Sequence, residues 1–292
     1  MSWGLISEMG HVAIQTTALA ASVADATELL GLRVTERTSD GSVYLAANAV
    51  HHELVYVESS RNGIHALGLI ARNGDALAEV RRRVEAENLP VLSERPISAG
   101  VADGFAFVGP EGWIFEVYTG MQKSDPGALS FGPDRYGHIN FHPQDVTGMM
   151  KFLSRVFDFR LSDVIGDDFA YFMRCNPDHH GIALIKGRGT FHHHAWHTQS
   201  VGDLAKLGDR LNRKGRELIW GPVRHGAGHN IAAYYVESSG AVVELYTDLE
   251  QIYDNDREPV IWGQDDNWYN MWSDRRPDDF RTFGIPPVDH RF

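Results

Sequence analysis

Four histidines fall within the seven residues of FHHHAWH, residues 191–197. Imidazole is the most common protein ligand for divalent transition metals, so the cluster indicates a metal site. His193 opens a predicted strand three residues before Trp196, just as His138 opens another strand three residues before Phe141. This shared spacing selects His193 and His138 as a pair.

A carboxylate completes a ligand set in the same half of the chain. Glu244 lies in the last predicted strand, four residues after Gly240. Two neutral imidazoles and one carboxylate from three strands are typical of an iron(II) facial triad, which leaves coordination positions open for substrate and dioxygen. We therefore expect His138, His193 and Glu244 to bind one divalent metal ion.

The other histidines of the cluster are assigned by strand geometry. Successive side chains of a strand point to opposite faces of the sheet, so His193, Ala195 and His197 are expected on one face. His192 and His194 are then expected to point away from the metal.

The chain contains an internal repeat. GHVAI at residues 10–14 matches GHINF at residues 137–141, and later segments match at the same spacing of 127 or 128 positions. A repeat of this length predicts a tandem duplication. The further matching segments are HHELVYV with HHGIALI, GDAL with GDLA, and GWIFEVYT with GAVVELYT.

Hydrophobic periodicity predicts the same alternation of elements in each half. The second half is expected to contain helices at 146–157 and 203–215 and strands at 137–141, 169–175, 179–185, 193–198, 230–237 and 241–247. Each half is therefore expected to contain two β-α-β-β-type units, and the expected fold is α+β with two tandem domains. We expect an N-terminal domain at 1–122, a linker at 123–135, a catalytic domain at 136–248 and a C-terminal extension over the domains at 249–292.

Composition narrows the class of partner. Of 292 residues, 43% are hydrophobic and 23% are charged, which is the balance of a soluble globular protein. The formal net charge of −12 argues against nucleic acid as a partner, and no apolar run approaches the length of a membrane span. Cys175 is the single cysteine, which fits a reducing compartment and predicts a cytoplasmic location.

The motifs of the second half together resemble a known family. This half is similar to the catalytic domain of type I extradiol ring-cleavage dioxygenases of the vicinal oxygen chelate superfamily, such as the dihydroxybiphenyl, catechol and homoprotocatechuate 2,3-dioxygenases. The resemblance implies the vicinal oxygen chelate fold in both domains, with two paired βαβββ modules in each. The motifs are GHIN at 137–140, CNPDHHGIAL at 175–184, HHHAW at 192–196, GPVRHG at 221–226 and YYVESSGAVVELYT at 234–247.

The resemblance implies a reaction and roles for particular residues. It implies cleavage of a catechol ring by O2, as in the degradation of aromatic hydrocarbons, with Fe(II) as cofactor and Mn(II) as the alternative. The family's metal ligands fall on the three residues already selected. His180 is expected to be the acid–base group near dioxygen, and Tyr234 and His225 are expected to hydrogen-bond the catecholate oxygens.

A neutral substituted catechol is the expected substrate. Family members that take carboxylated catechols present arginines, whereas this chain has Trp220, Tyr269 and Asn270 at the corresponding positions. Aromatic side chains instead favour a neutral alkyl or aryl group, while Trp196 is expected to be a packing residue. The expected substrate contacts are Asn140, Phe172, Phe191 and Trp220.

The first half repeats the ligand pattern without the other site residues. His11, His65 and Glu116 occupy the positions that correspond to the three ligands, so spacing alone allows a second metal site. The counterparts of His225 and Tyr234 are Ile97 and Ala106, which cannot transfer protons. We therefore expect the first domain to be vestigial and to lack a catalytic metal.

Three other functions remain open from the sequence. One is ring cleavage of hydroquinones, the second is a glyoxalase-type metal-dependent isomerase or transferase, and the third is non-catalytic binding of a small molecule. A glyoxalase-type enzyme would use a fourth protein ligand in place of open positions. A homo-oligomer is expected from the family and from the frequency of symmetric assemblies.

Overall fold

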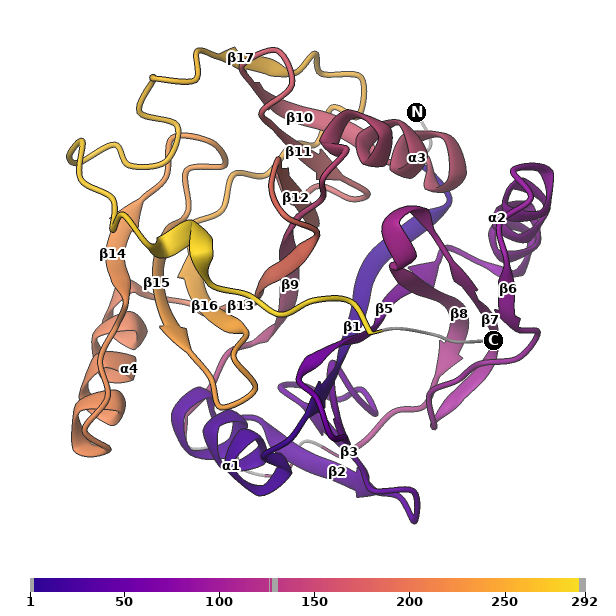
Figure 1. Ribbon diagram of the computed structural model, residues 1–292, viewed down its shortest axis with the longest axis horizontal. Coiled ribbons are helices and arrows are strands. Elements are labelled where there is room, and N and C mark those ends of the chain that lie inside the picture. The colour runs from indigo at the N-terminus through magenta and orange to yellow at the C-terminus, as the bar shows by residue number, and fades with distance from the viewer. Residues whose placement is uncertain (1–2, 126, 128–130, 289–292) are drawn as a thin grey trace.

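Two β-sheets dominate the computed structural model, one in each half of the chain (Figure 1). The structure describes residues 3–125, 127 and 131–288. Part of the expected linker at 123–135 lies outside these residues. The domain boundaries at 122, 136 and 248 stay a prediction, although each sheet is built from strands of one half together with, in the second half, one strand of the tail.

The first half forms an eight-stranded sheet in the order β2-β3-β4-β1-β5-β8-β7-β6. Each βαβββ module begins with a long strand, and these two strands pair antiparallel at the centre of the sheet. Helices cross between the first and second strands of a module. The elements are β1 (Ile6–Thr16), α1 (Leu19–Ala24), the π-helix η1 (Asp25–Leu30), β2 (Arg33–Arg37), β3 (Ser42–Ala46), β4 (Leu54–Glu58), β5 (Gly63–Ala71), α2 (Gly74–Ala86), β6 (Val91–Ser93), β7 (Val101–Val108) and β8 (Ile114–Met121).

The second half repeats this arrangement and adds one strand from the tail. Its order is β14-β15-β16-β13-β9-β12-β11-β10-β17, again with the two leading strands paired antiparallel. The prediction of an α+β fold with paired βαβββ modules is confirmed. The elements are β9 (Arg135–His142), α3 (Val146–Phe157), β10 (Arg160–Ile165), β11 (Ala170–Arg174), β12 (Ile182–Ile185), β13 (Thr190–His197), α4 (Val201–Arg213), β14 (Trp220–Arg224), β15 (Ile231–Val236), β16 (Val242–Thr247) and β17 (Val260–Trp262).

Local sequence explains where α3 begins and ends. The Asp145 carboxylate accepts a hydrogen bond from the Gly148 amide at 2.8 Å and so caps the helix. Met149, Leu153 and Phe157 lie on one buried face, which packs on the sheet. Asp158 ends the helix in the left-handed conformation, at φ 62°. The predicted bounds of this helix are confirmed.

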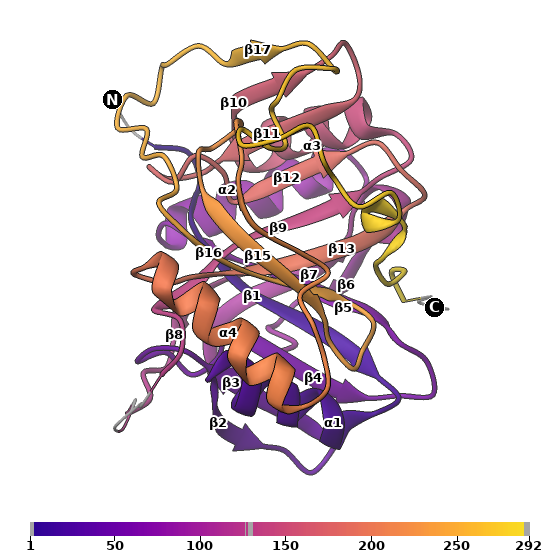
Figure 2. The ribbon, with the colours of Figure 1, turned by 90° about the vertical axis from the view of Figure 1, so that its left-hand side faces the viewer.

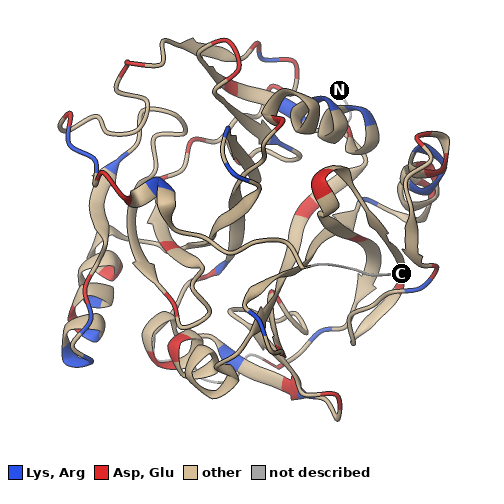
Figure 3. Ribbon diagram, viewed as in Figure 1, with Lys and Arg blue, Asp and Glu red and all other residues tan. Residues whose placement is uncertain are grey.

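The two halves contact one another through helices of non-equivalent modules. α2 of the first half packs against α3, and η1 packs against α4. Arg155 pairs with Glu87 at 2.9 Å across the first contact, and Arg210 donates to the Leu29 carbonyl at 2.6 Å across the second. Figure 3 shows residues of both charge signs along α2 and α4. A continuous hydrophobic core runs beneath these helices from one half to the other.

The tail after β16 pairs with strands of the second sheet and reaches the first. β17 adds a parallel strand beside β10 at the sheet edge. The short 3-10 helix η3 (Phe280–Thr282) then lies near the strands of the site, as Figures 1 and 2 show. Ile285 forms a bridge with Phe191, and Pro287 forms one with Ile64 of β5. The tail therefore connects both sheets.

No helix among the described residues is long and apolar enough to span a bilayer.

Candidate metal centre

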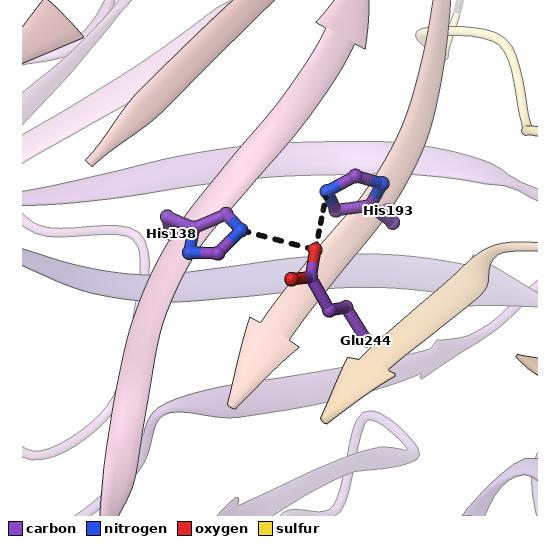
Figure 4. Close-up of side chains that lie close together, drawn as sticks. All are labelled: His138, His193 and Glu244. Carbon is purple, nitrogen blue, oxygen red and sulfur yellow. Dashed lines mark hydrogen bonds and ion pairs between the residues drawn. The ribbon is translucent and has the colours of Figure 1, made fainter. Parts of the chain in front are cut away.

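His138, His193 and Glu244 converge on one point between three adjacent strands (Figure 4). Glu244 Oε2 lies 3.1 Å from His138 Nε2 and 3.0 Å from His193 Nε2. Their ligand atoms all lie within 4.8 Å of one another, and all three side chains are buried. The predicted ligands are thus brought together.

Strand register explains this convergence. Ala195 of β13 is the Cα partner of His138 on β9 and also of Glu244 on β16. The three residues form a row across the sheet, and the small side chain of Ala195 leaves space between the two ligands. His193 lies two residues along the same strand and therefore faces the same side.

The electrostatics of the cluster favour a cation. Burial alone would raise the pKa of Glu244, but attraction to His138 and His193 outweighs burial and holds this pKa well below its ordinary value. Burial lowers the pKa of His193, which favours the neutral imidazole that a metal requires. Asn230 donates to Glu244 Oε1 at 2.9 Å and leaves Oε2 directed at the imidazoles. This donor set fits a divalent metal ion, and the three residues form a metal-binding site.

An open cavity of about 610 Å³ lies beside the three ligands. Its size is that of a small-molecule site. Strands and loops of the second half form most of its wall, and the tail supplies the rest. The other lining residues are Asn140, His142, Phe172, His180, Ala183, Ile185, His192, Trp220, His225, Ala227, Asn230, Tyr234, Trp268, Tyr269, Arg276, Phe280 and Arg281.

His225 and Tyr234 form a hydrogen-bonded pair at this cavity. His225 Nδ1 lies 2.6 Å from the Tyr269 carbonyl, which can only accept, so Nδ1 carries the proton. His225 Nε2 therefore accepts a hydrogen bond from the Tyr234 hydroxyl, at 2.6 Å. Burial, together with the nearby Glu244 charge, raises the pKa of Tyr234 well above its ordinary value and keeps this phenol protonated.

His180 lies directly beside the ligands. Its ring centroid is 4.3 Å from that of His138 and 5.1 Å from that of Phe172. Burial lowers the pKa of His180 well below its ordinary value, so the side chain is neutral in the resting site.

The expected substrate contacts divide into two groups. Asn140, Phe172 and Trp220 line the cavity, and Trp220 stacks on Tyr234 at 5.4 Å. Phe191 does not line it, because its side chain is fully buried in the hydrophobic core. The expectation for Phe191 is corrected accordingly.

The expected orientation of His192 is wrong, because β13 contains a bulge. Phe191 pairs with Phe141 and His193 pairs with Asn140, so His192 is an extra residue between two pairs. Its ring lines the cavity and stacks on His142 at 4.8 Å.

His142 was not predicted, although it follows Asn140 by two residues and thus shares the inward face of β9.

The tail residues of the wall were also not predicted. Arg276 and Arg281 line the cavity, so the site does present arginines to a substituent, contrary to what Trp220, Tyr269 and Asn270 had indicated. The Arg281 guanidinium lies 4.9 Å from the Phe169 ring centroid and donates to the Lys186 carbonyl at 2.8 Å, while its Nε is buried without a partner.

The first half does not assemble the equivalent ligand set. Gly68 of β5 pairs with both His11 and Glu116, as Ala195 pairs with His138 and Glu244. Ala66 therefore occupies the position equivalent to His193, and the expected correspondence of His65 is off by one residue.

The Glu116 carboxylate is occupied by hydrogen bonds from the protein. It accepts from the backbone amides of Ile97 and Ser98 and from the Ser98 hydroxyl. Within the described part of the chain, the metal-ligand arrangement is found at His138, His193 and Glu244 and is not repeated here.

Comparison with known proteins supports the resemblance that the second half of the chain shows to a known superfamily. A family model described as the Glyoxalase/Bleomycin resistance protein/Dioxygenase superfamily matches residues 135–245, which include all three ligands. Residues 135–245 belong to this superfamily. The matched segment runs from the first residue of β9 to a position within β16.

Whole-chain comparisons extend the similarity to both halves. The chain is 25% identical to metapyrocatechase of Pseudomonas sp. (strain CF600), over 87% of this chain and 89% of that protein. It is 24% identical to the manganese-dependent 2,3-dihydroxybiphenyl 1,2-dioxygenase of Geobacillus genomosp. 3, over 88% and 90%. The resemblance stated from the sequence is confirmed by these relatives.

Solved structures share the fold. The Mn(II)-bound glyoxalase from Novosphingobium aromaticivorans superposes with a TM-score of 0.88 at 27% identity, over 98% of this chain and 96% of that one. Homoprotocatechuate 2,3-dioxygenase from Arthrobacter globiformis superposes with a TM-score of 0.91 at 21% identity, over 99% and 94%. The vicinal oxygen chelate fold is thus confirmed for both halves.

Proposed function

We propose that this protein is an extradiol dioxygenase, which opens the aromatic ring of a catechol beside its two hydroxyl groups and incorporates both atoms of O2. The observation that carries the proposal is a ligand set of two histidines and one glutamate beside a cavity that also holds His180 and the Tyr234 and His225 pair. Relatives named as catechol and dihydroxybiphenyl dioxygenases support it.

His138, His193 and Glu244 would hold the metal, and we propose Fe(II) with Mn(II) as the alternative. A divalent metal with open positions would bind the diol and O2 together and carry electrons between them. One relative is named as manganese-dependent and one structural neighbour contains Mn(II), so both metals belong in the test.

The remaining polar residues would bind the diol and move its protons. The Tyr234 hydroxyl donates a hydrogen bond to His225, so the lone pairs of its oxygen can accept a hydrogen bond from a substrate hydroxyl. His180, neutral and adjacent to the ligands, would act as the acid–base group. Asn140 and the rings of Phe172 and Trp220 would contact the substrate.

Two further expectations concern the protein as a whole. We propose a cytoplasmic location, which rests on the single cysteine. We also propose a homo-oligomer, which light scattering of the purified chain would detect.

The decisive experiment reconstitutes the chain anaerobically with Fe(II) and, in parallel, with Mn(II). Catechol, alkyl- and aryl-catechols, carboxylated catechols and hydroquinones are then supplied with O2. We expect O2 consumption with a yellow ring-fission product for catechols, and none for Glu244→Gln.

Other outcomes would contradict the proposal in distinct ways. Consumption of O2 with hydroquinones alone would favour hydroquinone cleavage. No O2 consumption with any diol would favour an isomerase or a binding protein. The glyoxalase type is disfavoured because, among the described residues, no fourth His, Cys, Asp or Glu joins the three ligands.

A further inference from the structure

Asn230 connects the wall of the cavity to a metal ligand. It ends the loop that joins β14 to β15, lines the cavity and is only 2% exposed. Its Nδ2 atom donates to Glu244 Oε1 at 2.9 Å. The Asn230 backbone carbonyl accepts from the His225 amide at 3.0 Å, which closes the loop. The side-chain amide is therefore held in a fixed position beside the ligand.

The partners of this amide fix which way it faces. An amide nitrogen can only donate, so Nδ2 is the atom that must face Glu244 Oε1. The opposite orientation would place the Asn230 oxygen against an oxygen of the carboxylate. That amide oxygen, Oδ1, is buried and has no hydrogen-bond partner among the described residues. Because an unsatisfied buried acceptor destabilises a fold, stability alone does not account for an asparagine at this position.

The two oxygens of Glu244 consequently have different partners. Oε2 lies 3.1 Å from His138 Nε2 and 3.0 Å from His193 Nε2, as Figure 4 shows, whereas Oε1 accepts from Asn230. A carboxylate can bind a metal ion through one oxygen or through both. A hydrogen bond that engages Oε1 favours binding through Oε2 alone.

The first half has a different residue at the equivalent place. By strand register, the position of Asn230 corresponds to Ala102, whose side chain offers no donor. The Glu116 carboxylate instead accepts hydrogen bonds on both of its oxygens. In the second half, Asn230 engages one oxygen of Glu244 and the other faces the imidazoles.

We infer that Asn230 is a positioning residue, which holds Glu244 so that Oε2 alone is offered to the metal. Two imidazole nitrogens and one carboxylate oxygen would fill three positions of an octahedral ion and leave three open. Three open positions are enough for both oxygens of a diol and for O2, a consequence that rests on the proposed function. If Glu244 bound through both oxygens, one of these positions would be lost.

The first arm of the test counts the open positions and needs no turnover. The full-length chain is loaded with Mn(II), and the relaxation rate of water protons is measured over a range of field strengths to give the number of water molecules on the ion. We expect three in the unsubstituted chain and two in Asn230→Leu, in which Glu244 can bind through both oxygens. The relaxation enhancement should thus fall to about two-thirds. Two waters in the unsubstituted chain, or three in the variant, would overturn the inference.

Asn48→Leu is the matched control. Asn48 Nδ2 donates to Glu53 Oε1 at 3.0 Å, so this variant removes the same kind of hydrogen bond from a buried glutamate of the first half that is not among the three ligands. We expect three bound waters in this variant. A reduced number in both variants would contradict a specific role of Asn230.

The second arm measures turnover with Fe(II) and catechol at varied O2. Loss of a residue that orients a metal ligand typically costs about 10- to 100-fold in affinity or activity. We expect Asn230→Leu to lower kcat/KM for O2 by about ten-fold or more. The anaerobic Kd of catechol should change by less than about two-fold, because two positions still accept the diol. An unchanged kcat/KM for O2, or a loss confined to catechol binding, would contradict the inference.

Asn230→Ala guards against misfolding of the leucine variant. It removes the same donor without adding volume, and denaturant unfolding of the metal-free chains shows whether each variant folds. A count of three waters in a folded Asn230→Ala would overturn the inference as well. If the unsubstituted chain binds Mn(II) but turns over no diol, the proposed function fails while the water count still decides the role of Asn230.

Discussion

Glu244 and Glu116 occupy equivalent places in the two halves but have different partners. Glu244 faces two imidazoles, whereas the Glu116 carboxylate is satisfied by two backbone amides and a serine hydroxyl in addition to His11. A buried carboxylate needs such partners, and in the first half the protein supplies them from its own loop. Ala66 in the place of a histidine and these hydrogen bonds explain why the first half does not assemble the three-ligand arrangement of the second.

This difference predicts the outcome of matched substitutions. Glu244→Gln should weaken metal affinity by roughly 100-fold or more, since loss of groups that merely support a ligand already costs 10- to 100-fold. Glu116→Gln should leave one metal ion per chain. Elemental analysis after dialysis against limiting metal measures both. Metal loss in the Glu116 variant, or two ions in the unsubstituted chain, would contradict the assignment of a single site.

Gly137 is the second residue whose role follows from the geometry. It is unpaired in a bulge just before His138, and a Cβ atom there would lie 1.9 Å from the Tyr246 hydroxyl oxygen. Gly137→Ala should therefore destabilise the fold by about 1–3 kcal/mol. It should also weaken metal binding, because β9 must shift to relieve the clash.

Chemical denaturation and metal titration would check this prediction. Gly74→Ala is the control, because a Cβ atom at Gly74, at the start of α2, meets nothing within 4 Å. A Gly137 variant as stable as the control would show that the close contact with Tyr246 is not required.

At the scale of the element, β13 shows why strand faces are only partly predictable. The alternation of side chains along a strand predicted the face of His193 correctly and that of His192 wrongly. The reason is the bulge between Phe191 and His193, which adds one residue to the face that lines the cavity. A single sequence carries no clear signal for such a bulge. The same limit applies to β5, where a one-residue offset puts Ala66 in the place expected for His65.

The helices were predicted more accurately than the strands. The bounds of α3 follow from its apolar spacing and from Asp145 and Asp158 at its ends. α4 begins at Val201 and ends at Arg213, two residues earlier at each end than expected. Short strands such as β10 and β14 were missed, because their side chains are only partly buried and give little alternation.

The tail was the least predictable element. It has no counterpart in the repeat and little regular structure, so neither periodicity nor internal comparison could place its side chains at the cavity. Trp268, Phe280 and Arg281 all line the wall.

Arg281 gives the tail a testable role in substrate selection. Its guanidinium faces the cavity with no acidic partner among the described residues, so a carboxylated catechol would gain a charge-assisted hydrogen bond there. Arg281→Met should raise KM for such a substrate by about ten-fold, which corresponds to about 1.4 kcal/mol, and should change KM for catechol itself by less than two-fold.

Steady-state kinetics with both substrates would measure this effect. Arg275→Met is the control, because Arg275 is exposed and does not line the cavity. Equal changes for both substrates would mean that Arg281 supports the wall without contacting the substituent.

For the whole molecule, the internal repeat was the most informative property of the sequence. It predicted two halves of the same architecture and directed attention to His138, His193 and Glu244, which the fold brings together. The sequence could not indicate how the halves pack, because the contacts of α2 with α3 and of η1 with α4 depend on residues far apart along the chain.

Buried histidines in both halves make stability depend on pH. Burial holds the pKa of His52 far below its ordinary value and lowers that of His142 to about 3. Below about pH 6.5 the unfolded chain binds protons at these residues and the folded chain does not, so stability falls as the pH falls. Each such histidine contributes about 1.4 kcal/mol per pH unit.

Denaturant unfolding of the metal-free chain at pH 7, 6 and 5 would measure this slope. His52→Asn should reduce the slope between pH 6 and 5 by about 1.4 kcal/mol per unit. The corresponding variant of exposed His229 serves as the control. A slope that does not change in His52→Asn would mean that this histidine is protonated in the folded state.

The bridges from Ile285 to Phe191 and from Pro287 to Ile64 have a consequence for biosynthesis. Domains generally fold as units while the ribosome is still adding residues, with the N-terminal part first. Both sheets, apart from β17, can therefore form before the tail has emerged from the ribosome. The tail supplies Trp268, Phe280 and Arg281 to the wall, so the nascent protein brings its metal ligands together before its substrate chamber is complete.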